Sequence, residues 1–398
     1  MNKKIKILYI TPSADLYGSD VCLKEMVKRL DRERFLPFVV LPYKGDLFAE
    51  LSRLKGIKIE ILDLAVMRRK YMHPLRFFIF VWKFFLSSLK LYQLVKKNKI
   101  DIIHSNSSML QVGGVAAFCA SKSHVWHVRE ITLRPKILNI LLSIILSKLS
   151  TRILCITKAV KDSYISLDGF KKKAEVLYDS LDLAPYPRRI NSQTLKKELG
   201  IKDGFWVVGM VARINFWKGQ QVLLKAAEKV LQRSPRTVFL VVGGADERYG
   251  HDMLLEELKA LVERLKIKER VIFTGFRKDV YDIISLLDIF VLPSLNPEPL
   301  GLSLIQAMAS GKPVIATAQG GPLEIIDNHK TGILIPPNNP VILADALVDL
   351  LKDPQKRERM GQAGQRSVSE KFDFEKSGYM KKLEGLYYQV LKERRENV

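Results

Sequence analysis

Cysteine is scarce in this 398-residue chain. Cys22, Cys119 and Cys155 lie far apart in apolar surroundings and form no Cys-x-x-Cys pair, which excludes a disulfide scaffold and predicts buried thiols in a reducing compartment. No uninterrupted apolar run reaches the roughly 18 to 20 residues that a membrane-spanning helix needs. The apolar segment Ile7–Ile10 is too short for the core of a signal peptide. We therefore expect a cytoplasmic protein.

Two motifs of nucleotide chemistry are also missing. No Gly-Lys-Ser/Thr ending completes a P-loop, so we do not expect an ATPase. No Asp-x-Asp triplet occurs, so we expect neither an essential metal nor another cofactor. A hydrophobic content of 47% and a charged content of 27% are ordinary for globular proteins, which excludes a disordered or collagen-like chain. At roughly 150 residues per domain, the length predicts two or three domains.

Acidic residues are under-represented, most of all in the first half of the chain. Against 65 Lys+Arg there are 42 Asp+Glu, a formal net charge of +23. Residues 1–190 carry +18 of this charge and residues 191–398 carry +5. Residues 64–100 contain no acidic residue and nine basic ones, namely Arg68, Arg69, Lys70, Arg76, Lys83, Lys90, Lys96, Lys97 and Lys99.

Four of these basic residues recur at every seventh position: Arg76, Lys83, Lys90 and Lys97. On a helix this spacing drifts by only about 20° per step, so they form one basic stripe. The residues around the stripe are mostly apolar and aromatic, a composition typical of an interfacial membrane anchor. The alternative is a core helix with one solvated face.

A second apolar helix is predicted over Ile137–Leu149. It is flanked by the basic residues Arg134, Lys136, Lys148 and Arg152. Together the two helices favour contact with an anionic membrane surface over nucleic acid, because no recognisable nucleic-acid module accompanies the charge.

Short β-branched runs alternate with helical patterns in two passes along the chain. The first pass comprises Ile5–Ile10, Phe38–Leu41, Ile57–Leu62, Ile100–His104, Val125–His127 and Ile153–Ile156, and the second Trp206–Val211, Thr237–Val242, Val271–Thr274, Ile289–Pro293, Pro313–Ala316 and Gly332–Ile335. This alternation predicts parallel sheets with helices on both faces. The proline-rich segment Ala184–Arg189 is a natural linker.

We therefore predict an α/β fold of two Rossmann-like domains. The first covers residues 1–185 and the second residues 186–374. A final helix within residues 375–398 could pack back onto the first domain.

Open parallel sheets bind ligands at the carboxyl ends of their strands, where helix N-termini direct amides at anions. After the first strand, Gly18 and Ser19 permit close backbone approach to a phosphate or a sugar, although Ser19 or Asp20 could simply cap the next helix. After the strand at 206–211, Arg213 and Lys218 stand five residues apart ahead of a helix. This pair is suited to clamp a pyrophosphate, with a solvated loop as the alternative.

The segment 293–314 is the most informative part of the sequence. A strand ends in a proline-rich loop with one carboxylate, Glu298, and Gly301 then opens a helix that carries Gln306. The backbone amides of Leu300, Gly301 and Leu302 can donate to an anion. The side chains of Glu298 and Gln306 can accept hydrogen bonds from sugar hydroxyls.

These motifs, with Gly275-Phe276-Arg277 and Gly320-Gly321-Pro322-Leu323-Glu324, resemble in order the retaining GT-B glycosyltransferases of family 4. The resemblance covers nearly the whole chain and is strongest in residues 206–335. It implies a GT-B fold whose two domains face each other across a cleft. It also implies a nucleotide-sugar donor held mainly by the second domain and an acceptor bound mainly by the first.

The resemblance also implies roles for individual residues. Arg213 and Lys218 would hold the diphosphate and balance its charge as it leaves, and Glu298 would lie near the sugar hydroxyls. The amides of Leu300, Gly301 and Leu302 would contact the phosphates. Gly275, Phe276 and Arg277 would lie near the base, and Gly18 and Ser19 beside the diphosphate. His127, at the end of its predicted strand, matches the family's histidine near the donor sugar.

Two positions depart from the family pattern. Gln306 replaces the second glutamate, which accepts the ribose hydroxyls, and Ser19 stands where family members often have a second glycine. The expected reaction is metal-independent, front-face sugar transfer with retention, from a nucleoside diphosphate to a glycan or lipid-linked acceptor. A nucleotide-sugar epimerase of the same fold and an inactive sugar-nucleotide-binding protein remain alternatives. The basic first half points to the inner face of the cell membrane.

Overall fold

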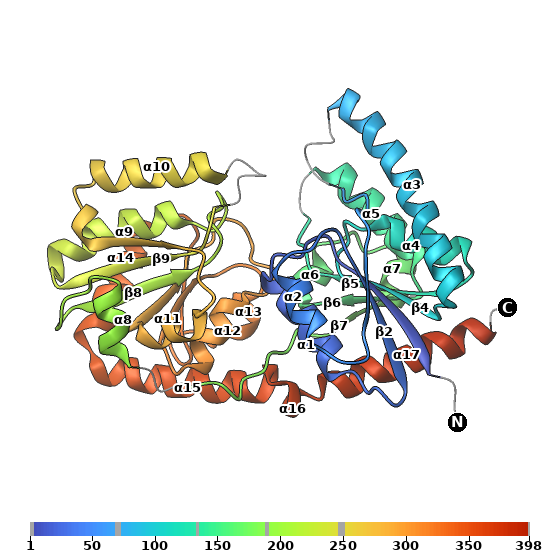
Figure 1. Ribbon diagram of the computed structural model, residues 1–398. Helices are drawn as coiled ribbons and strands as arrows, with labels where there is room; N and C mark the ends of the chain where they lie inside the picture. The colour runs from blue at the N-terminus through green and yellow to red at the C-terminus, as the bar shows by residue number, and fades with distance from the viewer. Residues whose placement is uncertain (1–3, 68–72, 133–134, 188–190, 246–250, 397–398) are drawn as a thin grey trace. The chain divides into compact units, whose positions relative to one another are not determined.

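The computed structural model describes residues 4–67, 73–132, 135–187, 191–245 and 251–396, which form two compact units (Figure 1). Unit 1 comprises Met1–Leu181 and Gly378–Val398, and unit 2 comprises Asp182–Ser377. The first division therefore falls a few residues before the predicted boundary at 185, and the second a few residues after the predicted boundary at 374. Each unit is a parallel sheet covered by helices, as the α/β prediction requires.

Unit 1 contains a seven-stranded parallel sheet in the order β3-β2-β1-β4-β5-β6-β7. Its strands are β1 Ile5–Ile10, β2 Phe35–Leu41, β3 Lys58–Ile61, β4 Ile102–Ser105, β5 Ser123–Val128, β6 Arg152–Cys155 and β7 Ala174–Val176. Its helices are α1 Gly18–Arg29, α2 Asp46–Ser52, α3 Pro74–Asn98, α4 Gln111–Cys119, α5 Lys136–Leu149, α6 Lys158–Asp162, α7 Asp168–Lys173 and α17 Tyr379–Glu396.

Unit 2 contains a six-stranded parallel sheet in the order β10-β9-β8-β11-β12-β13. Its strands are β8 Trp206–Val211, β9 Thr237–Val242, β10 Val271–Gly275, β11 Ile289–Leu292, β12 Val314–Thr317 and β13 Ile333–Ile335. Its helices are α8 Ser192–Glu198, α9 Gln220–Arg233, α10 His251–Arg264, the short 3-10 helix η3 Lys268–Arg270, α11 Val280–Leu286, α12 Leu302–Ala309, α13 Pro322–Ile325, α14 Pro340–Lys352, α15 Pro354–Phe372 and α16 Phe374–Ser377.

The central strands are buried on both faces, because helices cover each sheet on two sides. All residues of β4, β5, β9, β11 and β12 are buried. Burial on both faces explains why β9, β11 and β12 are nearly continuous apolar runs, whereas β4 and β5 also bury serine and histidine side chains. In each sheet the winding reverses once, between β1 and β4 in unit 1 and between β8 and β11 in unit 2. The loops at these two switch points are where open α/β sheets bind ligands.

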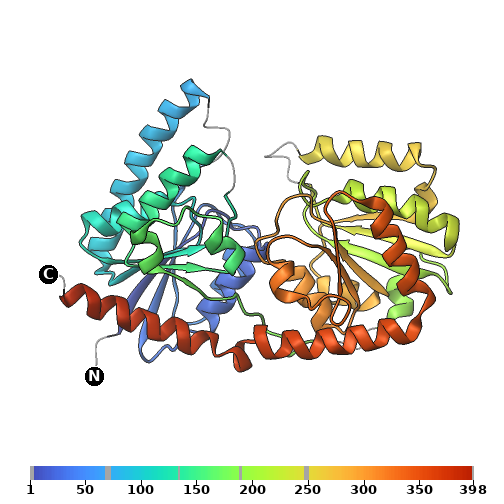
Figure 2. The same cartoon turned by 180° about the vertical axis from the view of Figure 1, so that it is seen from behind.

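The last helix, α17, belongs to unit 1 although it follows unit 2 in the sequence (Figures 1 and 2). The hydroxyl of Ser123 in β5 donates to the carbonyl of Val390, at 2.9 Å. The hydroxyl of Tyr379 lies 2.9 Å from the sulfur of Met26 in α1. These buried contacts attach α17 to β5 and to α1, the helix that follows the switch-point strand β1.

Three sequence predictions need correction. Strand β7 was missed, because its three residues directly follow Lys171–Lys173 and show no apolar run. Strand β5 continues to Val128, so His127 lies inside the strand instead of ending it. Cys119 is exposed at the end of α4, whereas Cys22 and Cys155 are buried as expected; all three thiols are free.

Candidate functional site

The switch point of unit 2 brings together Lys218 and Glu298, which are 80 residues apart in the sequence. Lys218 follows β8 and Glu298 follows β11, and these strands are neighbours. The ammonium donates to Glu298 Oε2 at 2.7 Å, and the Ser294 hydroxyl donates to the same oxygen at 3.1 Å. The side chains are 17% and 8% exposed, so a cation and a carboxylate face each other close to the surface of this edge.

Gly219 sets the separation between these two loops. It precedes α9 with a φ of 78°, and a Cβ atom at this position would lie 1.9 Å from the carbonyl oxygen of Pro293. Only glycine fits such an approach. The Gln220 side chain also donates to the carbonyl of Arg213 at 2.9 Å, which fixes the backbone that carries the half-buried Arg213 side chain. The predicted clamp residues are therefore held on one rigid loop.

The Gly-Gly motif after β12 packs directly against the Glu298 loop. The amide of Gly321 donates to the carbonyl of Glu298 at 2.7 Å. A Cβ atom on Gly320 would lie 2.2 Å from the same carbonyl oxygen, so no larger residue fits there. Glu298 is 6% exposed and cannot move far from Lys218. Two motifs that are separate in the sequence thus form one structure.

Helix α12 begins at this edge, directly after Gly301. The first amides of a helix have no partner within it, so Leu302 and the residue after it can donate to an anion. Leu300 is buried and anchors the loop, whereas Gln306 is half-buried in the second turn of α12. The arrangement provides anion-binding amides one loop away from the Lys218–Glu298 pair.

The Gly275-Phe276-Arg277 motif ends β10, at the outer edge of the same sheet. Phe276 is exposed. Arg277 donates to Asp279 at 2.7 Å and to Glu198 at 2.6 Å, and these hydrogen bonds to the two carboxylates raise the pKa of Arg277. The structure therefore pairs this guanidinium with the protein's own acids.

In unit 1, Gly18 and Ser19 form the start of α1, with Tyr17 at the N-cap position and no side-chain cap. Ser19 and Asp20 therefore lie inside the helix, which removes the capping alternative. Asp20 is fully buried and accepts from Ser13 Oγ at 2.9 Å and from Thr11 Oγ1 at 3.2 Å. Burial raises the pKa of Asp20 to about 6, and these hydrogen bonds only partly oppose the shift.

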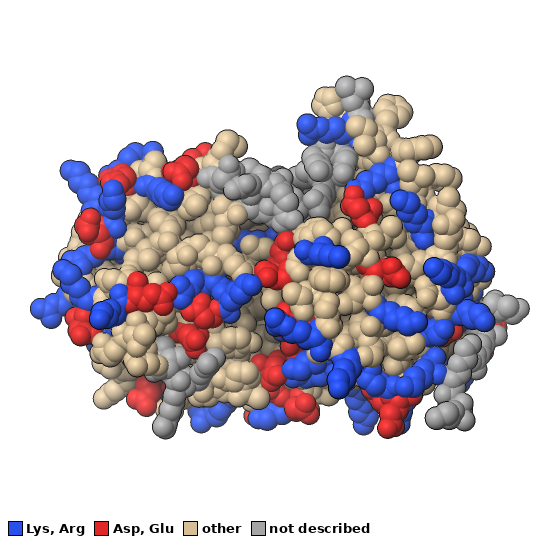
Figure 3. All heavy atoms as spheres, viewed as in Figure 1, with Lys and Arg blue, Asp and Glu red and all other residues tan. Residues whose placement is uncertain are grey.

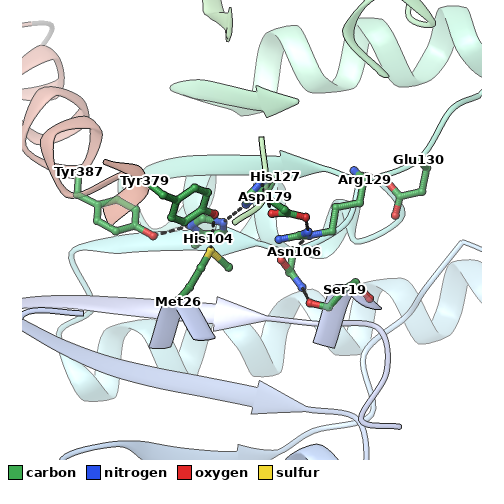
Figure 4. A network of polar contacts seen from close by, with 10 residues as sticks. All are labelled: Ser19, Met26, His104, Asn106, His127, Arg129, Glu130, Asp179, Tyr379 and Tyr387. Carbon is green, nitrogen blue, oxygen red and sulfur yellow. Dashed lines mark hydrogen bonds and ion pairs between the residues drawn. The ribbon is translucent and has the colours of Figure 1, made fainter. Parts of the chain in front are cut away.

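A group of residues that the sequence did not identify lies behind this helix start (Figure 4). Asn106, in the loop after β4, donates from Nδ2 to the carbonyl of Ser19 at 3.2 Å. Arg129, directly after β5, donates from Nε to Asn106 Oδ1 at 2.9 Å and forms an ion pair with Asp179. The available signal was a polar or charged residue shortly after each of β4, β5 and β7, but these residues are far apart in the sequence.

His127 is fully buried within β5, and its ring lies among other polar side chains. Its Nδ1 is 3.3 Å from His104 Nε2, and its Nε2 is 3.6 Å from Asp179 Oδ1. Burial lowers the pKa of His127 well below its usual value, and the charge of Arg129 adds to this effect, so the ring is neutral at pH 7. Its expected position near the donor sugar stays a prediction.

The predicted basic stripe lies on α3. Arg76, Lys90 and Lys97 are exposed, whereas Lys83 is half-buried and pairs with Asp63 at 2.5 Å. Arg68, Arg69, Lys70 and Arg134 lie outside the described residues. In the view of Figure 3, basic and uncharged side chains predominate over α3, and acidic ones are sparse.

The exposed face of α3 carries large aromatic side chains in addition to the basic ones. Phe78, Trp82 and Phe85 are 72%, 66% and 60% exposed, at a spacing that places them on one face. On α5, Ile137 and Leu141 are also exposed. Both helices start after the carboxyl ends of their strands and project from the same side of unit 1 (Figures 1 and 2).

Among the described residues, one stretch, Arg76–Asn98 of α3, has the length and hydropathy of a membrane-crossing helix, and 28% of it is buried. The sequence had not predicted this, because polar residues interrupt the apolar run. A single such helix is weak evidence for a membrane span. The described part of the chain contains no group of three His, Cys, Asp or Glu side chains that could hold a metal ion.

Comparison with known proteins places both units. Residues 17–184 match the family model "Glycosyltransferase Family 4", and residues 191–367 match "Glycosyl transferases group 1". The chain is 30% identical to the Escherichia coli UDP-Gal:alpha-D-GlcNAc-diphosphoundecaprenol alpha-1,3-galactosyltransferase, covering 67% of this chain and 70% of that one. It is 31% identical to the Bacillus anthracis N-acetyl-alpha-D-glucosaminyl L-malate synthase, covering 56% of this chain and 55% of that one.

Solved structures show the same fold over the whole chain. HepE of Anabaena, in complex with UDP and glucose, superimposes with a TM-score of 0.80 at 24% identity and 99% coverage of both chains. Sucrose-phosphate synthase from Thermosynechococcus elongatus gives a TM-score of 0.80 at 20% identity, covering 98% of this chain and 100% of that one.

Proposed function

This chain belongs to family 4 of the GT-B glycosyltransferases, and we propose that it transfers a sugar from a nucleoside diphosphate to an acceptor hydroxyl with retention of configuration. The contact between Lys218 and Glu298 carries this proposal, because it lies at the switch point where the fold binds ligands. The UDP bound to HepE and the UDP-galactose used by the Escherichia coli relative support a nucleotide-sugar donor.

The proposed chemistry requires stabilisation of negative charge as the diphosphate leaves an oxocarbenium-like sugar. Arg213, Lys218 and the first amides of α12 would supply preorganised positive charge, which is usually the largest contribution to catalysis. Glu298 would accept hydrogen bonds from the sugar hydroxyls and, before the donor binds, holds the Lys218 ammonium in place. We propose that this reaction needs no metal.

We propose that the acceptor is a glycan carried by a lipid diphosphate. The Escherichia coli relative acts on such an acceptor by its name. In this chain residues 1–190 carry a net charge of +18, and residues 1–181 of this range belong to the unit that would bind the acceptor. The predicted donor phosphates involve Arg213 and Lys218 of unit 2, so they leave this charge unexplained.

We further propose that α3 and α5 rest on the inner face of the cell membrane. The exposed residues Phe78, Trp82 and Phe85 of α3 and Ile137 and Leu141 of α5 would enter the interface. Basic side chains on α3 would face anionic lipid head groups, each worth about 1 kcal/mol at most. Such attachment is reversible and differs from a membrane span.

The function is tested with a panel of UDP-, GDP- and ADP-sugars. Thermal stabilisation of the protein identifies the donor, and transfer to a lipid-diphosphate glycan is then followed in the presence of EDTA, with the anomeric configuration of the product read by NMR. We expect transfer with retention and an unchanged rate in EDTA. Isomerisation of the nucleotide sugar without a glycosyl product, or binding without any turnover, would contradict the proposal.

Membrane contact is tested separately by cosedimentation with vesicles. We expect binding to anionic vesicles and little to neutral ones, and loss of binding in a Phe78→Ser/Trp82→Ser variant. The matched control is Phe118→Ser. Phe118 is 73% exposed but lies near the end of α4, where the chain returns to the amino end of β5. Equal behaviour with both kinds of vesicle would rule out the electrostatic part of this proposal.

A further inference from the structure

A series of buried polar side chains runs through unit 1 from α17 (Figure 4). It begins at Tyr387, whose hydroxyl lies 3.0 Å from that of Tyr9 and 2.7 Å from His104 Nδ1. From His104 it continues through His127 to within 3.6 Å of Asp179 Oδ1. Asp179 is 1% exposed and the other four side chains are fully buried, so solvent does not compete for any of these contacts.

From Asp179 the series continues to the start of α1. The carboxylate binds Arg129, the guanidinium binds Asn106 Oδ1, and Asn106 Nδ2 donates to the Ser19 carbonyl. Asn106 is fully buried and Arg129 is 8% exposed. The last contact joins the loop after β4 to the helix that follows β1, and these two strands flank the switch point of the sheet.

The protonation states of the two histidines limit which atoms of this series can donate. Both histidines are neutral, because burial holds the pKa values of His104 and His127 well below their usual range. A neutral His104 ring has one N–H donor, so it can accept from the Tyr387 hydroxyl at Nδ1 and donate from Nε2 to His127 Nδ1. The series of hydrogen bonds ends at His127, because His127 Nε2 and Asp179 Oδ1 are 3.6 Å apart and neither atom has a hydrogen-bond partner among the described residues.

The same logic fixes the Asn106 amide. A guanidinium can only donate, so the amide oxygen faces Arg129 and the amide nitrogen must face the Ser19 carbonyl. Without Arg129 the amide could turn, and its oxygen would then repel that carbonyl. Glu130 fixes the loop from the other side, where it accepts from Ser108 N at 3.0 Å and from Ser108 Oγ at 2.7 Å.

We propose that Arg129 is a positioning residue for the donor. Acting through Asn106, it fixes the Ser19 carbonyl and hence the first turn of α1, while Asp179 holds its guanidinium. This inference rests on the proposed function, because it takes the Gly18–Ser19 turn to lie beside the donor diphosphate.

The test compares two truncations of buried asparagines in the same unit. Asn106→Ala removes the link to Ser19. Asn139→Ala is the matched control, since Asn139 is 5% exposed on α5, donates to the Ser163 carbonyl at 2.6 Å and accepts from the Ile165 amide at 3.0 Å. A third variant, Arg129→Lys, keeps a cation beside Asp179 but loses the planar fork that reaches Asn106.

Two readouts are measured on the full chain. The first needs no ligand: hydrogen exchange at the amides of Asp20 and Val21, which both donate to the Tyr17 carbonyl at the start of α1. The second is kcat and KM for transfer from UDP-glucose, or from whichever nucleotide sugar the donor panel identifies. We expect Asn106→Ala and Arg129→Lys to speed exchange at these amides and to lower kcat/KM by about 100-fold, because positioning errors near 1 Å cost about that much.

The outcomes separate the two claims. If Asn106→Ala matches Asn139→Ala in both exchange and kcat/KM, the positioning inference is overturned. Unchanged exchange in Arg129→Lys would overturn the role of the guanidinium. If the unaltered protein neither binds nor uses any nucleotide sugar, the proposed function fails, while the exchange data still decide whether Arg129 orders the start of α1.

Discussion

The switch points of the two units occupy equivalent places in their sheets, but different chemistry joins their loops. In unit 2 an ion pair, Lys218–Glu298, joins the loops after β8 and β11 directly. In unit 1 a neutral amide, Asn106, joins the start of α1 to the loop after β4, and the ion pair Arg129–Asp179 stands one contact behind it. The charged pair of unit 2 therefore lies at the carboxyl edge of its sheet, whereas the charged pair of unit 1 lies one contact behind that edge.

The two pairs also differ in how far solvent and ligands can reach them. The Lys218 ammonium keeps 17% of its side-chain surface in solvent, so an incoming phosphate can compete for it. Asp179 is 1% exposed, and separating Arg129 from it would leave a buried charge unpaired. Under the proposed function, the unit 2 pair would exchange partners when the donor binds, whereas the burial of the unit 1 pair favours keeping its partners.

The largest effect on stability is expected from breaking the buried pair. Arg129→Met should lower the free energy of unfolding by about 3 to 5 kcal/mol, because the Asp179 carboxylate is left without a cation. The double variant Arg129→Met/Asp179→Leu should recover most of this loss in urea unfolding. It should not recover donor affinity, because Asn106 remains unsupported. Recovery of affinity would show that the pair acts only on stability.

The edge pair should show the opposite pattern. Lys218→Ala is expected to lower kcat by about 100- to 1000-fold, since it removes preorganised positive charge from the leaving diphosphate. Its free energy of unfolding should fall by no more than about 2 kcal/mol. The control is Lys225→Ala, an exposed lysine on α9. Unchanged turnover in Lys218→Ala, measured with the confirmed donor, would refute the clamp.

A third test uses pH and concerns unit 1 alone. Burial raises the pKa of Asp20 from 3.8 to about 6. Because the pKa is higher in the folded state, this group favours folding below about pH 4, and that contribution is lost as the pH rises through 6. The shift corresponds to about 3 kcal/mol.

Urea unfolding at pH 4 and pH 7 measures this contribution. The stability difference between the unaltered protein and Asp20→Asn should be larger at pH 4 than at pH 7. The exposed residue Asp203, changed to Asn, is the control and should show no such dependence. Equal differences at both pH values would mean that Asp20 does not change its protonation at the start of α1.

The smallest effect is expected at Gln306, next to the unit 2 edge. Gln306→Glu restores the carboxylate of the family pattern, and its charge-assisted hydrogen bonds to ribose should strengthen donor binding by about tenfold at most. Calorimetric titration with UDP would measure this. Unchanged affinity would mean that Gln306 does not reach the nucleoside.

The sequence was sufficient to predict most of the fold. The boundaries of β1, β8 and β9 agree with the structure, because their β-branched runs end at polar or small residues. The candidate site of unit 2 could also be identified from the sequence, because its motifs are local and follow strand ends. Whether Arg277 meets a base or only the carboxylates of Asp279 and Glu198 could not be read from sequence, because the partners lie on separate elements.

The candidate site of unit 1 could not be identified from the sequence in the same way. Its members come from the ends of β4, β5 and β7 and from α17, so no local pattern unites Asn106, Arg129, Asp179 and Tyr387. The aromatic residues of α3 were easier to recognise in the sequence, since their abundance beside basic residues predicted an unusual surface. Their exposure depends on which face packs against α4, and only the structure provides this.

The place of α17 also bears on how the protein is made. Unit 2 is one uninterrupted segment of the chain, so it can complete its core while synthesis continues. Unit 1 needs residues that come before and after unit 2 in the sequence. Until α17 has been synthesised, His104 and Tyr9 lack the Tyr387 hydroxyl. A chain that stopped after unit 2 would therefore leave unit 1 without α17, although the other elements of unit 1 are made first.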